Sequence, residues 1–132
     1  MLEKYCKDNF QNSSDVSTKL LEYKKLLLDA NQHMNLIGKS TIDDFDRRHF
    51  LDCIQIHEHM SEKNKLTADL GTGAGLPGIL LSIVGYKNLH LVEKSPKKSA
   101  FLKNCKLRLG LDCTIHNQPL AEVSLSNARY IV

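Results

Sequence analysis

The chain lacks any long hydrophobic run. Among its 132 residues, no apolar stretch approaches the roughly 20 residues that a membrane-spanning helix needs. The N-terminal stretch from Met1 to Lys7 carries charges of both signs and no apolar signal core. We therefore expect neither membrane insertion nor export and predict a cytoplasmic protein. Internal repeats and low-complexity segments are also lacking, which excludes repetitive architectures.

Cysteine pairs of the C-x-x-C type are absent as well. The four cysteines lie far apart in the sequence, so we expect reduced, mostly buried thiols, as in a cytoplasmic protein. His57 and His59 have a spacing that metal ligands can have, but no cluster of further ligands accompanies them, and we predict no metal site. An obvious catalytic pair of acid and base is missing too.

The composition is that of an ordinary soluble domain. Hydrophobic residues make up 42% of the chain and charged residues 25%, which together with the length predicts one domain with a modest core. The net charge of +3 is mildly basic, so it is compatible with a nucleic-acid partner without identifying one.

The most informative stretch runs from Leu66 to Gly78. A short apolar run with an acidic residue near its end meets four glycines within eight residues, and the apolar run Ile79–Val84 follows. This order predicts a strand, a tight loop and a helix. Glycine is needed where the backbone takes a positive φ or approaches a ligand closely. We expect Pro77 in the first helical turn, and free N–H groups at that helix start that suit an anionic group.

The spacing of the glycines fits two kinds of cofactor. Gly71-x-Gly73-x-Gly75 is typical of loops that bind S-adenosylmethionine (SAM), whereas Gly73-x-Gly75-x-x-Gly78 satisfies the dinucleotide fingerprint. A glycine pattern alone is weak evidence, and a strand, turn and helix without any ligand is a further alternative.

An acidic residue strengthens the case for a nucleoside ligand. The second apolar run, Leu89–Val92, ends in Glu93, which lies 22 residues beyond Gly71. An acid about 20 residues after the glycines, at the end of the second strand, is placed to bind ribose hydroxyls. Asp69 just before the loop and the two predicted N-terminal helices favour SAM over a dinucleotide.

The N-terminal part of the chain is predicted to be helical. Residues 1–14 are polar, and we expect them to be frayed. Apolar residues recur at steps of three and four from about Asp15 to Met34, which predicts an amphipathic helix. Ser40 is a candidate cap for the next helix, and a helical pattern continues from Ile42 to Met60.

The C-terminal part alternates strands and helices. Ser95 and Pro96 predict the start of a helix that ends at Gly110. Residues 112–116 are expected to form a third strand and residues 129–132 to begin a fourth. Such alternation indicates a parallel, doubly wound sheet whose ligands bind outside the carboxyl ends of the strands.

Several blocks of sequence stand in a characteristic order and spacing. They are Asn35-Leu36, Arg48-His49-Phe50-Leu51-Asp52-Cys53, Asp69 to Gly78, Glu93, Lys97-Lys98-x-x-Phe101-Leu102, and Ala121-Glu122. Together they resemble the small-subunit ribosomal RNA methyltransferase G family, also called glucose-inhibited division protein B. The resemblance extends from about Leu20 to Val132.

The resemblance implies an α/β, Rossmann-like fold of SAM-dependent methyltransferases, with a doubly wound, mostly parallel sheet. Residues 1–62 would form a helical segment packed on a SAM-binding part, residues 63–132. It also implies methyl transfer to N7 of a guanine in 16S ribosomal RNA. The expected partners are this RNA or the small ribosomal subunit, with a monomeric protein and neither metal nor membrane.

Residue roles can be carried over from the family by position. The implied cofactor-binding residues are Asp69, Gly71, Thr72, Gly73, Gly75, Leu76, Glu93, Ala121 and Glu122. The implied RNA-binding residues are Arg47, Arg48, Lys97 and Lys98. By composition alone, these basic residues also fit an ordinary solvated surface.

Two departures from the family pattern matter. Leu120 stands where the family commonly has arginine, which affects one contact to RNA or cofactor. The chain stops at Val132, within the predicted fourth strand, whereas family members continue, so we expect the C-terminal part of the sheet to be missing. One alternative is therefore a truncated, non-catalytic fragment that binds SAM. The other is an NAD-dependent oxidoreductase domain, which Gly73-x-Gly75-x-x-Gly78 and Glu93 would fit.

Overall fold

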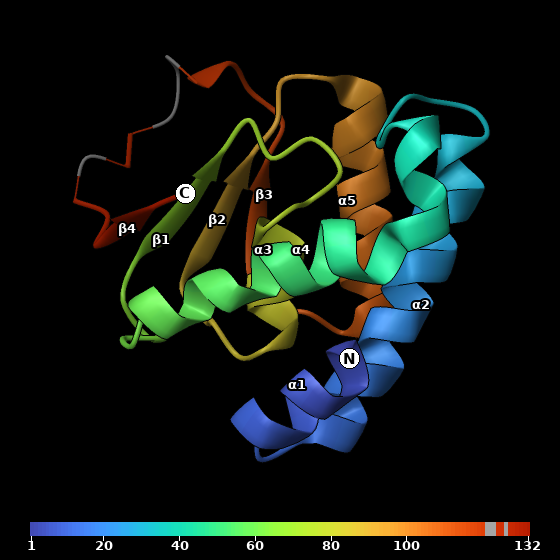
Figure 1. Cartoon of the computed structure of the whole chain (residues 1–132). Coiled ribbons are helices and arrows are strands. Elements are labelled where there is room, and N and C mark those ends of the chain that lie inside the picture. Colours follow the sequence, from blue (N-terminus) through green and yellow to red (C-terminus); the bar gives the residue numbers. More distant parts are fainter. Residues whose placement is uncertain (121–123, 126) are drawn as a thin grey trace.

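A four-stranded parallel sheet lies at the centre of the protein (Figure 1). The computed structural model describes residues 1–120, 124, 125 and 127–132. The strands are β1 (Thr67–Leu70), β2 (Leu89–Val92), β3 (Cys113–His116) and β4 (Tyr130–Ile131). Their order is β3-β2-β1-β4. Strands β2 and β3 therefore lie on one side of β1, and β4 lies on its other side. The predicted α/β fold with a doubly wound parallel sheet is confirmed.

The helices are of three kinds. The α-helices are α1 (Leu2–Asn9), α2 (Ser13–Asn31), α3 (Asp52–Ile54), α4 (Gly78–Ile83) and α5 (Pro96–Leu109). The 3-10 helices are η1 (Lys39–Asp44) and η3 (Gln55–His59), and η2 (Asp46–Leu51) is a π-helix. No helix in the described part of the chain is both long enough and apolar enough to cross a membrane.

Helix α2 and the sheet share one hydrophobic core. Val16, Leu20, Tyr23 and Leu27 are the buried residues of α2, at steps of three and four as predicted. They belong to the same buried cluster as residues of α4, α5 and β2. The helical N-terminal part therefore contributes directly to the core that positions the strands.

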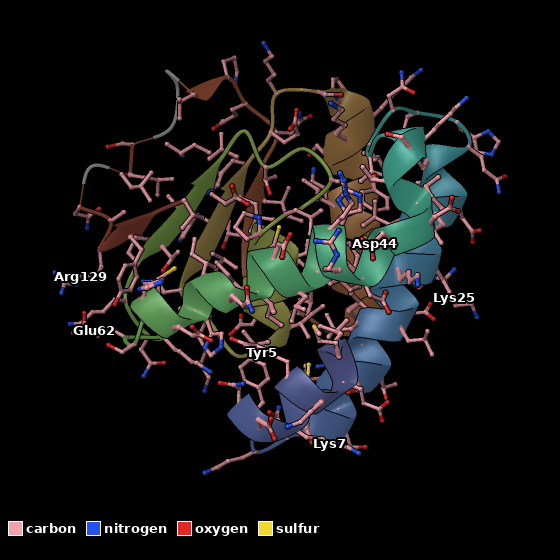
Figure 2. All side chains as sticks on the ribbon, in the orientation of Figure 1. Tyr5, Lys7, Lys25, Asp44, Glu62 and Arg129 are labelled. Atoms are coloured by element: carbon pink, nitrogen blue, oxygen red, sulfur yellow. The ribbon has the colours of Figure 1, made fainter. Side chains whose placement is uncertain are left out.

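The expectation that residues 1–14 are frayed is wrong. Residues 2–9 form α1, in which Cys6 is fully buried, and Phe10 is buried just after it. The Tyr5 hydroxyl donates to Glu58 Oε1 and lies 2.9 Å from His57 Nε2, so α1 is attached to η3 (Figure 2). Two buried side chains are too few for a visible periodicity, and these contacts join residues far apart in the sequence.

The predicted cap at Ser40 is also wrong. Gly38 occupies the N-cap position of η1, no side chain caps this helix, and Ser40 is exposed within it. Instead, the Thr41 hydroxyl donates to the carbonyl of Gly38 at 2.6 Å and lies 2.7 Å from His49 Nε2. The predicted helix over residues 42–60 is a succession of short 3-10, π and α segments, which these local side-chain contacts help to set.

The ends of α5 are as the sequence predicts. Ser95 is the N-cap, and its side chain accepts a hydrogen bond from the Lys98 N–H at 3.3 Å. Pro96 is the first helical residue, and Gly110 follows the helix in the left-handed conformation, with φ of +63°.

Replacing Ser95 or Ser99 by alanine should have different effects on the free energy of unfolding. Ser95→Ala should lower the free energy of unfolding by about 1 kcal/mol, because it removes the cap. Ser99→Ala should be neutral or stabilising, because the Ser99 hydroxyl is buried and has no hydrogen-bond partner among the described residues. Urea unfolding of both variants measures the difference, and equal losses would contradict the assigned cap.

Candidate functional site

The glycine loop, residues 71–77, joins β1 to α4 at the carboxyl end of the central strand (Figure 1). Gly71, Gly73 and Gly75 have φ of +67°, +58° and +92°, as the glycine pattern predicts. A Cβ atom added at Gly71 or Gly73 would meet nothing within 4 Å. The loop therefore presents backbone to open space, where a ligand can approach closely.

Asp69 holds the two ends of the glycine loop together. It is 3% exposed, and its Oδ2 atom accepts hydrogen bonds from Thr72 Oγ1 at 2.6 Å and from the Gly78 N–H at 2.8 Å. Burial raises the pKa of Asp69 to about 6, against the opposing effect of these two bonds. Asp69 and Thr72, both predicted to bind cofactor, are engaged with each other and shape the loop.

The start of α4 differs from the prediction. The N–H of Gly78 donates to Asp69, and the N–H groups of Ile79 and Leu81 donate to the carbonyls of Gly75 and Pro77. The expected row of free N–H groups for an anion is therefore absent at these three positions. Pro77 was expected within the first helical turn, but it lies just before the first helical residue.

Glu93 holds the middle of the loop. Its Oε1 atom accepts from the Gly73 N–H at 2.9 Å, its Oε2 atom accepts from the Ser95 N–H at 2.9 Å, and the residue is 7% exposed. Each oxygen of a carboxylate can accept more than one hydrogen bond. The same carboxylate can therefore hold Gly73 and still accept from the hydroxyls of a ribose.

Tyr23 supports the loop from α2, and sequence reasoning missed this role. Its hydroxyl donates to the carbonyl of Ala74 at 2.6 Å in a buried hydrogen bond. Its ring stacks on Phe50 of η2, with ring centres 5.3 Å apart and planes inclined by 12°. The available signal was a tyrosine within a core-facing stripe, because a buried tyrosine needs a hydrogen-bond partner.

Of the remaining residues predicted to bind the cofactor, two lie in the glycine loop and two lie outside the described part of the chain. Gly75 is buried and Leu76 is half-buried in the loop. Ala121 and Glu122 lie outside the described residues. Asn117, which follows β3, donates from its side chain to the carbonyls of Glu93 and Lys94. These bonds bring the start of the segment after β3 to the same edge of the sheet as the glycine loop.

Comparison with known proteins decides the family. A family model described as rRNA small subunit methyltransferase G matches residues 16–129. The chain belongs to this family. The predicted resemblance is thereby confirmed.

Individual relatives agree with the family model, and all those described here are named ribosomal RNA small subunit methyltransferase G. The protein of Rhodospirillum centenum is 38% identical over 109 residues, which cover 83% of this chain and 50% of that protein. The protein of Orientia tsutsugamushi is 42% identical over 94 residues, 71% of this chain and 48% of the relative. That of Rickettsia akari is 34% identical over 113 residues, 86% and 59% respectively. The chain thus spans about half the length of the curated relatives it matches.

The basic residues implied by the methyltransferase G family lie on two elements. Lys97 and Lys98 are in the first turn of α5, which begins just after Glu93 at the edge that carries the glycine loop. Arg47 and Arg48 are exposed on η2. Arg47 pairs with Asp44, with 2.7 Å between Nε and Oδ2, which raises the arginine pKa. One of the four positive charges is therefore already partnered within the protein.

Metal ligands do not gather in the described part of this methyltransferase G chain. No group of three or more histidine, cysteine, aspartate or glutamate residues there has the proximity that a metal ion requires.

The free cysteines Cys6, Cys105 and Cys113 are buried, and burial raises the pKa of each thiol.

Proposed function

We propose that the glycine loop binds SAM, and that the protein of this family acts as a methyltransferase on N7 of a guanine in 16S ribosomal RNA. The observation that carries the choice of cofactor is the carboxylate of Asp69 at the start of α4. A dinucleotide places its pyrophosphate at the N-terminus of this helix. Asp69 takes the Gly78 N–H and adds negative charge at that place, which disfavours a pyrophosphate.

SAM matches the same surroundings. It has no phosphate, its sulfonium is positively charged, and its ribose offers hydroxyl donors. Glu93 can accept from those hydroxyls, and the open space at Gly71 and Gly73 lets the ligand lie against the backbone. By family resemblance, Leu76 would complete the loop contacts, and Ala121 and Glu122 would flank the adenine.

When bound, SAM supplies a methyl group that is already activated for transfer. Guanine N7 carries a free lone pair and no proton, so the reaction requires no general base. The residues then have to hold both reactants in line and keep water out. Asp69, Glu93 and Tyr23 each fix one part of the loop, which suits it for positioning. A hollow of about 640 Å³, lined by Asp52, Cys53 and Pro77 among others, adjoins the end of the loop.

The proposed substrate is 16S ribosomal RNA, free or in the small ribosomal subunit, which implies a cytoplasmic protein. Lys97, Lys98 and Arg48 would contact phosphates, with Arg47 contributing if it leaves Asp44. Such contacts make binding weaker as salt concentration rises. Guanine N7 is reached in an unstacked, exposed nucleotide, so we propose a single-stranded target. We propose a monomer.

Calorimetric titration of the chain with SAM tests the cofactor. We expect saturable SAM binding, no binding of NAD, and loss of SAM binding in Gly71→Arg, because an arginine side chain would fill the open space at the loop. Gly110→Arg is a matched control, since Gly110 has nearly the same φ (+63° against +67°) and equally open surroundings beyond α5. NAD binding without SAM binding would overturn the proposal.

Methyl transfer is tested separately. We expect labelled methyl groups from SAM to enter 16S RNA that lacks the modification, at a rate that falls as salt rises. SAM binding without transfer to free RNA or to small subunits would support the alternative of a cofactor-binding chain without catalysis.

A further inference from the structure

The positive charge of the chain is concentrated in residues 94–111, which include α5. This segment holds six of the chain's 18 lysines and arginines and none of its 15 aspartates and glutamates. The remaining 12 cationic residues are outnumbered by the acids, so the net charge of +3 comes entirely from this segment. Its cationic residues are Lys94, Lys97, Lys98, Lys103, Lys106 and Arg108. Basic residues gathered along one helix are a feature of surfaces that bind nucleic acid.

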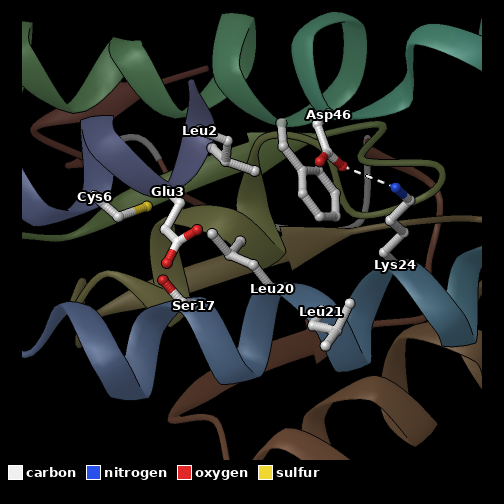
Figure 3. Close-up of a pocket in the computed structure, with 9 residues that line it drawn as sticks. Leu2, Glu3, Cys6, Ser17, Leu20, Leu21, Lys24 and Asp46 are labelled. Carbon is white, nitrogen blue, oxygen red and sulfur yellow. Dashed lines mark hydrogen bonds and ion pairs between the residues drawn. The ribbon is translucent and has the colours of Figure 1, made fainter.

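Several cationic side chains elsewhere in the protein are paired with acids. On α1 and α2, Lys4, Lys7 and Lys19 each lie within 4.0 Å of an acid one turn away. Lys24 points at Asp46 (Figure 3). Among the described residues, none of the six cationic groups of segment 94–111 has an acidic partner within this distance. Their charges are therefore available to an external anion.

Helix α5 turns one side to the core and the other side to solvent. Its buried residues are Ser99, Phe101, Leu102, Cys105 and Leu109. Lys97, Lys103 and Arg108 are exposed, and Lys98 and Lys106 are half-buried. The apolar side of the helix is thus covered by the protein itself. What remains is a charged surface without the apolar face by which an amphipathic helix enters a membrane.

The first turn of α5 has an unfavourable charge. It contains Lys97 and Lys98 and no acidic residue. The N-terminal end of a helix carries a partial positive charge, so cations there destabilise the helix, whereas anions stabilise it. This end lies just after Glu93, at the edge of the sheet that carries the glycine loop (Figure 1). An anion bound at this end would offset the repulsion.

We propose that the solvent-facing side of α5 binds the phosphate backbone of the RNA strand that leads to the target nucleotide. The strand passes Lys97 and Lys98 near the glycine loop and continues along Lys103, Lys106 and Arg108. The 14 residues of α5 span about 21 Å at about 1.5 Å per residue. A stacked strand advances about 3.4 Å per phosphate, so this length can face several phosphates. The choice of ribosomal RNA rests on the proposed function, whereas binding of an RNA backbone does not.

Fluorescence anisotropy of a labelled oligouridylate tests the proposal without any cofactor and without guanine. We expect the complete chain to bind this RNA, with an affinity that falls as the salt concentration rises. The triple variant Lys103→Gln, Lys106→Gln, Arg108→Gln should reduce the slope of log K against log salt by about 2, because each phosphate contact on a single strand contributes about 0.7.

A second triple variant, Lys4→Gln, Lys7→Gln, Lys19→Gln, is the matched control. It removes the same net charge, but from lysines that already have acidic partners. Its slope should equal that of the wild type. An equal fall in both triple variants would show that only net charge matters and would overturn the proposal. An unchanged slope in the α5 variant, or no RNA binding by the wild type, would overturn it too.

The affinity for SAM separates this proposal from the proposed function. Both triple variants should bind SAM as the wild type does, because none of the six substituted residues lies in the glycine loop. If the wild type failed to bind SAM while the RNA slopes came out as expected, the proposed function would fall and the RNA surface would stand.

Lys97→Gln should have opposite effects on stability and on RNA binding. It should raise the urea concentration at the midpoint of unfolding, because it removes a cation from the positive end of α5, and it should weaken binding of oligouridylate. Lys25→Gln, on the exposed side of α2, should change neither quantity (Figure 2). Unchanged RNA binding in Lys97→Gln, or equal weakening in Lys25→Gln, would contradict the path of the strand.

Discussion

Gly75→Ala should lower the free energy of unfolding by about 3–5 kcal/mol, a large part of the total stability of a small domain. An added Cβ atom would clash with Ile79 Cγ1. It would also lie 3.0 Å from the Tyr23 hydroxyl and 3.0 Å from Leu102 Cδ2, so it cannot be accommodated by moving one flexible side chain. The φ of +92° adds backbone strain, because L side chains rarely adopt this conformation.

Gly73→Ala is the matched control for this substitution. Gly73 belongs to the same loop and also has a positive φ, of +58°, but an added Cβ atom would meet nothing within 4 Å. Only the backbone cost remains, which is about 1 kcal/mol. Urea unfolding of the two variants separates steric crowding from backbone strain. Similar losses in both would show that the contact of the loop with Tyr23 and Ile79 is not tight.

Asp69→Asn should remove a pH-dependent loss of stability between about pH 4 and pH 6. The pKa of Asp69 is raised by burial to about 6 in the folded protein, against a usual value of 3.8. Between these values the folded state holds a proton that the unfolded state has released, so stability falls as pH rises through this window. The difference of about two pKa units corresponds to about 3 kcal/mol.

Asp69→Asn should raise the free energy of unfolding because the substitution keeps the hydrogen bonds of the site and removes the charge. Asparagine has nearly the same shape as aspartate and can place its oxygen where Oδ2 accepts from Thr72 and Gly78. It carries no charge, so it avoids the cost of burying a carboxylate above pH 6. Relative to the wild type, the variant should therefore gain about 3 kcal/mol between pH 4 and pH 7.

Urea unfolding of both proteins at several pH values measures this gain. Other titrating groups are common to the two proteins and cancel in the difference. A stability difference that stays constant with pH would show that Asp69 is ionised in the folded protein throughout the window.

These two predictions describe a loop that is fixed from three directions. Asp69 joins its ends, Glu93 holds Gly73, and Tyr23 holds Ala74. Gly78 has no room for a side chain either, since an added Cβ atom would lie 2.6 Å from Asp69 Oδ2. Close packing of α4 on β1 therefore depends on this glycine, which belongs to the dinucleotide fingerprint and not to the SAM-type spacing.

Local signals in the sequence were sufficient to predict the elements around the glycine loop. The glycines at 71, 73 and 75 predicted positive φ, because other residues pay a steric cost there. Ser95, Pro96 and Gly110 predicted the ends of α5, because caps act within one turn of the helix. The runs that became β1, β2 and β3 were visible as short apolar segments between turns, and their parallel orientation followed from the intervening helices.

Other features depended on contacts between distant parts of the chain. Helix α1 is ordered because Tyr5 meets His57 and Glu58, which are more than 50 residues away in the sequence. The start of α4 has no free N–H at Gly78 because Asp69 reaches it from β1, nine residues earlier. Tyr23 became part of the site only when α2 packed beside the loop.

The sequence by itself determined the α/β fold, the family and the place of the glycine loop, because glycine conformations, caps and hydrophobic periodicity act over a few neighbouring residues. Only the tertiary structure decided which groups hold that loop. It showed that Asp69 and Glu93 are hydrogen-bonded to the loop itself, and that Tyr23 supports it from another element. The physical reason is that a buried polar group must find a hydrogen-bond partner, and the folded arrangement alone determines which partner lies within reach.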